Sequence, residues 1–434
     1  MAAAPVTFTG LKRVAPSEVA ALQLDPIDDK TRQQALDIVQ KVKSGGEEAL
    51  LELATQFKDL PEGAKHLLSP EDLKAAYDAL PLSQQELLQR VAGRIRAFAQ
   101  AQVDSLKPME MAVPGGRAGH TIAPVAAAGC YAPGGRYPLP SSVLMTAITA
   151  RVAGVKAVYV ASPRPHPITL GAAHVAGADG LLAIGGAQAI AAMAYGIGGL
   201  PPADVIAGPG NRWVTAAKAF VASSGVCAID MLAGPSECLV LADETADPAV
   251  VAADLLAQAE HDTDALPVLV TTHEPLAQAV DEELQKQLAQ LPTAPVAAAA
   301  AAKGLAVVAG SLEEAIAVSD RIAPEHLEVM TADAEGVGQR LSNYGALFVG
   351  TAAAEVFGDY GAGPNHVLPT SGTARFTGGL SVFTFLRVRT HIVASTGADP
   401  AGLQQLVQDS AALAELEGLI GHQRSALARG TASE

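Results

Sequence analysis

The residues best suited to chemistry are Glu325 and His326, which stand side by side in RIAPEHLEVM, residues 321–330. An imidazole is a base near neutral pH, and a carboxylate beside it can steer or activate water. Neighbouring side chains of an extended segment point in opposite directions, so the pair could act on two sides of one substrate or in two separate steps. A capping glutamate and a core histidine are the more frequent use of such residues, and the pattern alone leaves that interpretation open.

A metal site is the second candidate. Gln258 and His261 in LLAQAEHD are three residues apart, which places both on one face of a helix. A complete site needs two more ligands from far along the chain, and the candidates are Asp359, His366, Glu417 and His422. Such nitrogen and oxygen ligands suit zinc or manganese. The alternative is that Gln258 and His261 end an amphipathic helix on its wet side.

Glu417 and His422 pose a geometric problem. Five residues along an unbroken helix rotate by ~140°, so the two side chains could not share one site. Gly418 and Gly421 lie in the same stretch, and glycine weakens a helix. A break there would let both side chains converge; the alternative is a solvated tail helix.

A nucleotide site receives weaker support. In open parallel sheets, ligands bind at the carboxyl ends of strands, and three polar residues are expected in loops at such ends: Tyr131, Gln188 and Asn211. Each could contact a ribose, a phosphate or a nicotinamide, or each could be an ordinary polar loop residue. The dinucleotide fingerprint G-x-G-x-x-G is absent, since GPGNRW (residues 208–213) holds only its first half.

The elements that position these residues follow from periodicity. The first hundred residues show helical spacing, with a Gly-Gly break at 45–46. From about residue 121, short apolar segments alternate with helical patterns, which predicts parallel sheets covered by helices. A second run of the same kind begins at CLVLAD, residues 238–243. The sequence therefore predicts two α/β domains preceded by helices, with a mostly helical final fifty residues.

Composition excludes several classes of function. The chain has 434 residues, a net charge of −16 and no basic stripe, which argues against a nucleic-acid partner. Three cysteines in a chain of this length indicate reduced thiols. The start shows no secretory signal and no apolar run is long enough to cross a bilayer, so we expect a cytoplasmic protein without membrane contact.

Taken together, the motifs resemble those of the histidinol dehydrogenase family. The resemblance covers nearly the whole chain beyond the first hundred or so residues and rests on eight motifs in order: YAPGGRYPLPSSVLM, GGAQAIAAMAYG, AGPGN, DMLAGPSE, LLAQAEHD, APEHLEV, GDYGAGPNHVLPT and EGLIGH. It implies two incomplete Rossmann-like parallel-sheet domains with N-terminal helices and a helical C-terminal tail. The implied domains are 1–129 with 239–381, 130–238 on the NAD side, and a tail of 382–434 that contacts a partner subunit.

The resemblance also implies a reaction and roles for the residues. Members oxidise L-histidinol to L-histidine through a bound aldehyde in two NAD-dependent steps, at the end of histidine biosynthesis. His326 would take the alcohol proton and Glu325 would activate water for the second step. The implied zinc ligands, one ion per subunit, are Gln258, His261, Asp359 and His422. The implied substrate contacts are Ser236, His326, His366, Glu417 and the four zinc ligands, and the implied NAD contacts are Tyr131, Gln188 and Asn211.

Family members are homodimers in which the tail reaches the partner's site, so Glu417 and His422 would arrive from the other subunit. Two other classes remain open from the residues alone. A metal-dependent hydrolase could use an adjacent Glu and His to activate water without any redox step. A non-catalytic ligand-binding protein is the third reading, and the presence of both Glu325 and His326 argues against it.

Overall fold

The computed structural model describes residues 8–19, 27–61, 63–134, 137–395, 397 and 399–430. It divides into two compact units, one within residues 1–100 and 126–385 and the other within 101–125 and 386–434. The first unit holds two six-stranded sheets and the second a three-stranded sheet. The predicted α/β class with two parallel sheets is confirmed, because alternating apolar strands and small-residue helices specify this arrangement.

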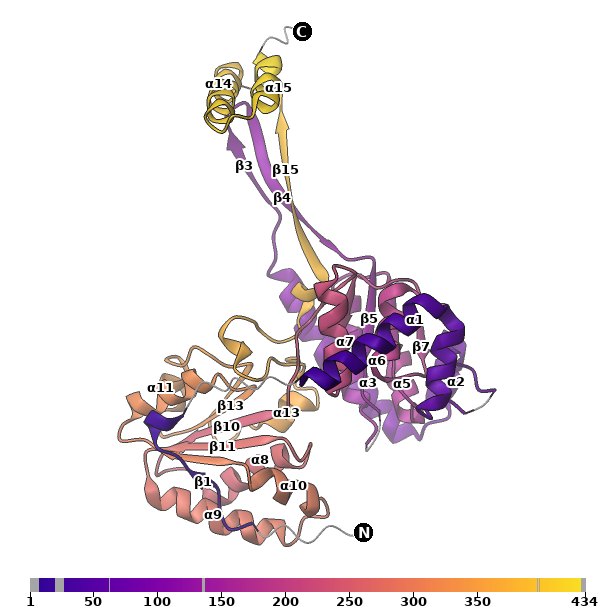
Figure 1. The fold of residues 1–434 in the computed structure, drawn as a ribbon. Coiled ribbons are helices and arrows are strands. Elements are labelled where there is room, and N and C mark those ends of the chain that lie inside the picture. The colour runs from indigo at the N-terminus through magenta and orange to yellow at the C-terminus, as the bar shows by residue number, and fades with distance from the viewer. Residues whose placement is uncertain are drawn as a thin grey trace. The chain divides into compact units, whose positions relative to one another are not determined.

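One six-stranded sheet is parallel throughout and has the order β1-β12-β11-β10-β13-β14. Its strands are β1 (Lys12–Arg13), β10 (Glu237–Ala242), β11 (Leu266–Thr271), β12 (Leu305–Val308), β13 (His326–Met330) and β14 (Ala346–Val349). Its helices are α8 (Pro248–Ala259), α9 (Glu274–Leu288), α10 (Ala294–Ala301), α11 (Leu312–Ile322), α12 (Ala334–Gly338) and α13 (Glu355–Asp359). Cys238 and Val240 pack under α8, α9 and α10, whereas Leu239 and Leu241 pack under α11 and α12, so the sheet is buried on both faces (Figure 1).

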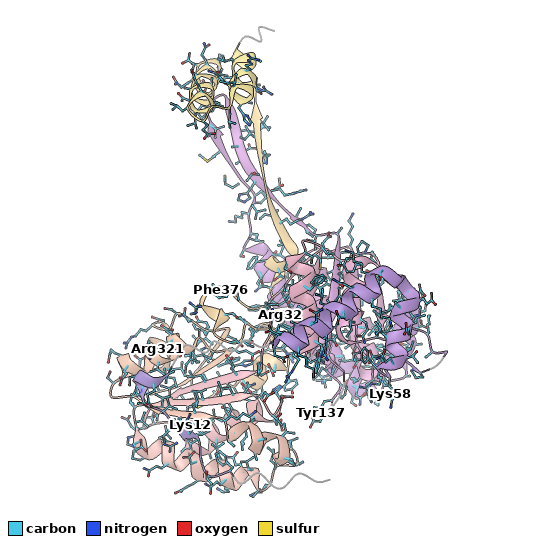
Figure 2. The ribbon with its side chains drawn as sticks, in the orientation of Figure 1. Lys12, Arg32, Lys58, Tyr137, Arg321 and Phe376 are labelled. Atoms are coloured by element: carbon cyan, nitrogen blue, oxygen red, sulfur yellow. The ribbon has the colours of Figure 1, made fainter. Side chains whose placement is uncertain are left out.

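The N-terminal segment is tied to this sheet. β1 pairs with β12, and a short 3-10 turn, η1 (Pro16–Glu18), follows it. Arg321 at the end of α11 donates to the backbone carbonyl of Pro16 at 2.8 Å; Lys12 and Arg321 are marked in Figure 2.

The other six-stranded sheet has the order β2-β7-β6-β5-β8-β9, parallel except for the β2–β7 pair. Its strands are β2 (Leu67–Leu68), β5 (Ala127–Tyr131), β6 (Ala157–Ala161), β7 (Gly180–Leu182), β8 (Val205–Ala207) and β9 (Ala228–Ile229). Its helices are α4 (Pro140–Val152), α5 (Pro167–Ala176), α6 (Gly186–Tyr195) and α7 (Arg212–Ser223).

The N-terminal helices are α1 (Asp29–Gln56), α2 (Pro70–Asp78) and α3 (Leu82–Asp104). The expected Gly-Gly break is a kink inside α1, where Gly46 has φ 61°. Helix α1 packs against α6 and α7, and α2 packs against α5. Helices α1 and α2 therefore pack on helices of the sheet around β5, whereas the predicted first domain joins residues 1–129 to 239–381. The domain boundaries stay a prediction.

The second unit is an antiparallel ribbon of β3 (Met109–Val113), β4 (Gly116–Pro124) and β15 (Leu386–Ala394) that ends at α14 (Pro400–Leu416) and α15 (Ile420–Gly430) (Figure 1). The final fifty residues are mostly helical, as predicted, but residues 386–394 form a strand that pairs along the whole of β4. The expected break near Gly418 is confirmed, since this glycine has φ 74° between the two helices. Two 3-10 turns, η2 (Thr373–Arg375) and η3 (Val382–Phe385), precede β15.

None of the described helices combines the length and the apolar character that a membrane crossing requires.

Candidate active site

The Glu325–His326 pair lies at the amino end of β13, where helix α11 passes into the strand through Pro324. His326 is the first residue of the strand and is paired with Cys238 of β10, so the site faces the amino edge of this sheet. Helix α8 leads back to the same edge and brings Gln258 and His261 there. The rule that ligands bind at carboxyl ends therefore does not locate this site.

Glu325 and His326 converge on one neighbour, Glu237, the first residue of β10. A carboxylate oxygen of Glu325 accepts the backbone N–H of Glu237 at 2.9 Å. The Nδ1 of His326 donates to the backbone carbonyl of Glu237 at 3.1 Å. The expectation that the two side chains point in opposite directions is wrong here, because the strand begins only at His326 and alternation does not extend back to Glu325.

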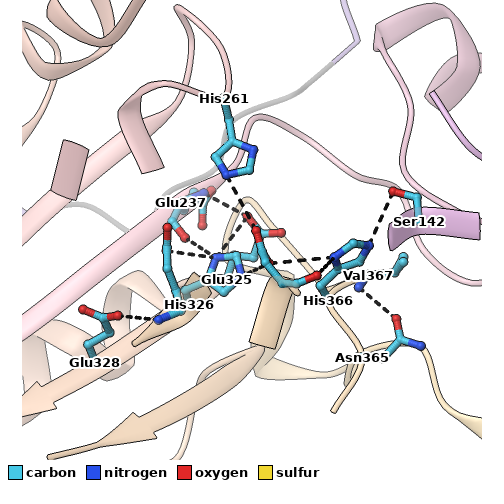
Figure 3. A network of polar contacts seen from close by, with 11 residues as sticks. Ser142, Glu237, His261, Glu325, His326, Glu328, Asn365, His366 and Val367 are labelled. Atoms are coloured by element: carbon cyan, nitrogen blue, oxygen red, sulfur yellow. Dashed lines mark hydrogen bonds and ion pairs between the residues drawn. The ribbon is translucent and has the colours of Figure 1, made fainter. Parts of the chain in front are cut away.

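The tautomer of His326 follows from the groups around its ring (Figure 3). Nδ1 faces acceptors only: the Glu237 carbonyl, a Glu355 carboxylate oxygen at 3.7 Å and a Glu325 carboxylate oxygen at 3.8 Å. Nδ1 therefore carries the proton in the neutral ring. Nε2 is buried and has no hydrogen-bond partner in the described part of the chain, so its lone pair is available to accept a proton.

Burial and charge tune both groups of the pair. Burial raises the pKa of Glu325 to about 7, with the adjacent His326 opposing that rise. Burial lowers the pKa of His326, but the carboxylates of Glu325, Asp359 and Glu355 outweigh it and raise that pKa to about 10. Two titratable groups with perturbed pKa values in one buried place are typical of catalytic sites.

Asp359, at the end of α13, is the centre of a histidine cluster. Its carboxylate oxygens lie 3.6 Å from Nε2 of His326, 3.7 Å from Nε2 of His261 and 3.9 Å from Nδ1 of His366. Burial tends to raise the pKa of Asp359, but its interactions with His326, His366 and His261 prevail and lower it. The structure thus brings together four predicted residues that lie far apart in the sequence, namely His261, His326, Asp359 and His366.

His366 links this cluster to the other sheet of the same unit. Its Nδ1 donates to the backbone carbonyl of Asp359 at 3.0 Å, so its Nε2 accepts from the Ser142 hydroxyl at 3.4 Å. The neighbouring Asn365 donates to the Met145 carbonyl on α4 at 2.9 Å. Figure 3 shows Ser142 joined to the His366 ring, and Asn365 joined to the backbone N–H of Val367.

The residues present fit a metal ion. Gln258 is fully buried, and neither its amide oxygen nor its amide nitrogen has a hydrogen-bond partner among the described residues. A buried side-chain amide normally has hydrogen-bond partners, and a cation bound to the amide oxygen would satisfy this one. His261 and Asp359 are close enough to bind the same ion with bonds of about 2 Å.

The prediction that Gln258 and His261 lie on one face of a helix is wrong. Helix α8 ends at Ala259, so His261 lies beyond it, and its side chain is 41% exposed while Gln258 is buried. No group of three histidine, cysteine or acidic side chains within the described ranges is arranged to hold a metal ion by itself. A site here must therefore combine the Gln258 amide with a ligand from elsewhere.

Ser236, Glu417 and His422 are the other predicted site residues. Ser236 immediately precedes β10, and its carbonyl accepts the N–H of Leu266. Glu417 is the C-cap of α14, His422 lies in the first turn of α15, and both are exposed in the second unit. Their roles stay predictions.

Sequence reasoning missed Glu237 and Glu355, which contact the pair directly. Both are about 1% exposed, and burial raises the pKa of each to about 8. Glu355 stands four residues before Asp359, the spacing that places two side chains on one face of a helix. That spacing was the signal that could have found it.

The three predicted NAD contacts line one cavity of about 660 Å³ at the carboxyl ends of β5, β7 and β8. Tyr131 is the last residue of β5 and Gln188 lies in the first turn of α6, so only Asn211 is in a loop as expected. The Tyr131 hydroxyl accepts the Gly186 N–H at 3.1 Å, and the Asn211 side chain caps α7. A cavity of this size is sufficient for a cofactor.

Asp59 occupies the N-terminal end of α6 inside this cavity. One of its carboxylate oxygens accepts the Gly185 N–H at 3.1 Å and the Gln188 amide at 2.9 Å. Burial raises the pKa of Asp59, although these hydrogen bonds and the charge of Arg164 oppose that rise. A helix N-terminus is a ready anion site, and here the chain's own carboxylate fills it.

Comparisons with known proteins agree with one another. A sequence model described as histidinol dehydrogenase matches residues 25–430. The histidinol dehydrogenase of Halobacterium salinarum is 45% identical, with 95% of this chain and 96% of that protein covered. The sulfopropanediol 3-dehydrogenase of Ruegeria pomeroyi is 42% identical, with 90% of each covered. A crystal structure of histidinol dehydrogenase from Elizabethkingia anophelis matches with a TM-score of 0.89 at 32% identity, covering 96% of this chain and 98% of that one.

Proposed function

Because the chain belongs to the histidinol dehydrogenase family, we propose that it oxidises L-histidinol to L-histidine through L-histidinaldehyde, in two NAD-dependent and zinc-dependent steps in the cytoplasm. The observation that carries this proposal is the His326 ring, whose Nδ1 is held by acceptors and whose Nε2 faces Asp359, with Glu325 beside it. A four-electron oxidation at one carbon needs a base for the alcohol and an activated water for the aldehyde, and this pair supplies one group for each.

Each residue of the pair has one task. In its neutral form, His326 takes the hydroxyl proton of the alcohol on Nε2 in the first step. A bound zinc ion would favour that form, because its charge would offset the carboxylates that raise the pKa of this ring. The Glu325 carboxylate takes a proton from the water that adds to the aldehyde, which suits a pKa of about 7. Tyr131, Gln188 and Asn211 would hold NAD, which would supply the hydride acceptor for both oxidations.

The metal would be held by Gln258, His261, Asp359 and the partner's His422. When bound, zinc supplies positive charge that can anchor nitrogen atoms of the substrate and offset the surrounding carboxylates. Ser236, His366 and the partner's Glu417 would hold the remainder of the substrate in place. His366 is suited to this task because the Asp359 carbonyl and Ser142 fix its ring.

The charge of the site supports an amino alcohol as substrate. Asp359 keeps its negative charge because its pKa is lowered, and the Glu325 carboxyl group lies on the other side of the His326 ring, so the region favours a cationic group over an anion. Because the relative from Ruegeria pomeroyi is named for a sulfopropanediol, that anionic diol is the comparison substrate.

A homodimer with shared sites is part of the proposal. The second unit exposes many apolar side chains, as expected of a surface that another subunit covers. They are Met109, Met111, Val388, Ile392, Val393, Leu406, Leu413, Leu416, Leu419, Ile420 and Leu427.

The test of the proposed function is NADH formation by the purified protein. We expect two NADH per L-histidine formed from L-histidinol, little NADH from sulfopropanediol, and loss of turnover with a chelator that zinc restores. A hydrolase would leave NAD unchanged. NADH from the diol alone would overturn the assignment of the substrate.

Binding of NAD can be followed separately through Trp213, the single tryptophan of the chain. This side chain lines the cavity, and its indole N–H donates to Gln34 at 3.0 Å. NAD should therefore change its fluorescence, and Trp213→Phe should remove the signal while turnover continues. Unchanged fluorescence at NAD concentrations that saturate turnover would contradict NAD binding in this cavity.

A further inference from the structure

The NAD-side cavity contains an acid whose position is unusual for a dinucleotide site. Asp59 lines this cavity and is buried, and one of its carboxylate oxygens accepts the Gly185 N–H at 3.1 Å and the Gln188 amide at 2.9 Å. In dinucleotide-binding folds, such a helix N-terminus receives the pyrophosphate. Here Asp59 occupies the N-terminal end of α6, so a dinucleotide in this cavity would meet Asp59 with another of its groups.

The backbone before Asp59 directs this acid into the cavity. Helix α1 ends in a turn in which the Asp59 N–H donates to the Ala54 carbonyl at 2.8 Å and the Lys58 N–H donates to the Thr55 carbonyl at 3.1 Å. Lys58, which is labelled in Figure 2, has φ 58° at the position of this turn where glycine is usual. The left-handed region is unfavourable for lysine, so these hydrogen bonds and the contacts of Asp59 with α6 must maintain the turn.

Asp59 also fixes the orientation of the Gln188 amide. An ionised carboxylate can only accept, so the amide nitrogen of Gln188 faces Asp59 and its amide oxygen is left for another donor. Among the described residues, none donates to that amide oxygen or to the second carboxylate oxygen of Asp59. Asp59 and Gln188 therefore form a pair of hydrogen-bond acceptors in the wall of the cavity.

A pair of acceptors fits hydroxyl groups and disfavours a phosphate. The hydroxyls of a ribose can donate to such a pair, whereas a 2′-phosphate brings negative charge and further acceptor oxygens. We propose that Asp59, together with Gln188, accepts the hydroxyls of the adenosine ribose and is a specificity-determining residue that makes the cavity select NAD over NADP. This inference rests on the proposed function, which supplies the dinucleotide.

The other charged groups of the cavity do not account for this selection. Among the described residues that line it, they are Asp37 and Arg164. Asp37 is exposed on α1, where it accepts the Gln33 amide at 2.8 Å, so water and salt screen its charge. Burial raises the pKa of Asp59 and the charge of Arg164 opposes that rise, so these two charges interact. Asp59 thus balances the cation that could otherwise hold a 2′-phosphate.

The affinities of NAD and NADP test the proposal. They are measured by equilibrium dialysis on the full-length protein with zinc, in wild type, Asp59→Asn, Asp59→Ser, Asp59→Glu and Asp37→Asn. We expect wild type to bind NAD about 100-fold more tightly than NADP, and both neutral variants at position 59 to lower that ratio about 10-fold or more. Asp59→Glu keeps the charge and Asp37→Asn removes a screened charge, so both should keep a ratio close to that of wild type.

The ratio separates a specific role of Asp59 from a structural one. NAD and NADP differ only in the 2′-phosphate, so a general loosening of the cavity would weaken both alike and leave their ratio unchanged. With L-histidinol as substrate, the ratio of kcat/KM for NAD to that for NADP should fall in Asp59→Asn by the same factor as the affinity ratio.

Several results would overturn the proposal. They are an unchanged ratio in both neutral variants at position 59, an equal fall in Asp37→Asn, and a wild type that binds both dinucleotides equally or binds neither. A wild type that binds NAD selectively but does not oxidise L-histidinol would refute the proposed substrate. The affinities of the variants would still decide the role of Asp59.

Discussion

Replacing His326 by alanine is expected to slow NADH formation from L-histidinol by about 10²- to 10⁴-fold, the usual contribution of a positioned general base. The reason is local, because Nε2 of this ring lies 3.6 Å from the Asp359 carboxylate and is the nitrogen that can accept a proton in the neutral ring. With L-histidinaldehyde supplied directly, the same variant should lose much less activity. Initial rates with the two substrates measure the difference.

Glu325→Gln is the matched partner of that experiment. It should preserve the first hydride transfer and slow the second by about 100-fold or more, since an amide cannot take the proton of water. Rapid mixing with L-histidinol and NAD should then give a burst of one NADH per site followed by a slow phase. Equal loss of both half-reactions in this variant would show that the two roles are assigned wrongly.

Replacing His422 by alanine is expected to weaken zinc binding by about 100-fold or more, because even losses outside the ligand set cost 10- to 100-fold in metal affinity. Metal content after dialysis against a weak chelator is the measurement. His391→Ala is the control, as it removes another histidine of the second unit, from β15. Unchanged zinc in His422→Ala would exclude this residue as a ligand.

Mixed dimers test whether the ligand comes from the partner. A purified heterodimer of one His326→Ala subunit and one His422→Ala subunit would hold both lesions in one site and none in the other. It should regain about half of the wild-type activity, although each homodimeric variant is nearly inactive. If His422 served its own subunit, both sites would carry a lesion and the heterodimer would stay inactive.

The sequence predicted the sheets well because local patterns encode them. Short apolar runs such as those at β5, β6, β10 and β11 are buried on both faces. Their length and the glycine, proline or polar residues that end them can be recognised from the local sequence alone. The strand β13 was harder to recognise, because Glu328 stands within it as a fully buried acid.

The rest depended on long-range contacts. In the second unit β4 pairs with β15, although more than two hundred and fifty residues separate the two strands in the sequence, and no local pattern predicts that pairing. The site on the amino edge likewise forms only when β10 and β13 become neighbours, since Glu237 then meets both residues of the pair. Periodicity could suggest Glu355 as a companion of Asp359, but not that it would face His326.

Asp59 has a consequence for the design of inhibitors against the NAD-side cavity. A compound that imitates a dinucleotide's phosphate would meet like charge at the start of α6, where this carboxylate already takes the Gly185 and Gln188 donors. An amide or a protonated amine would instead find an acceptor there. Donor-bearing compounds should therefore discriminate between this cavity and dehydrogenases whose helix end receives phosphate.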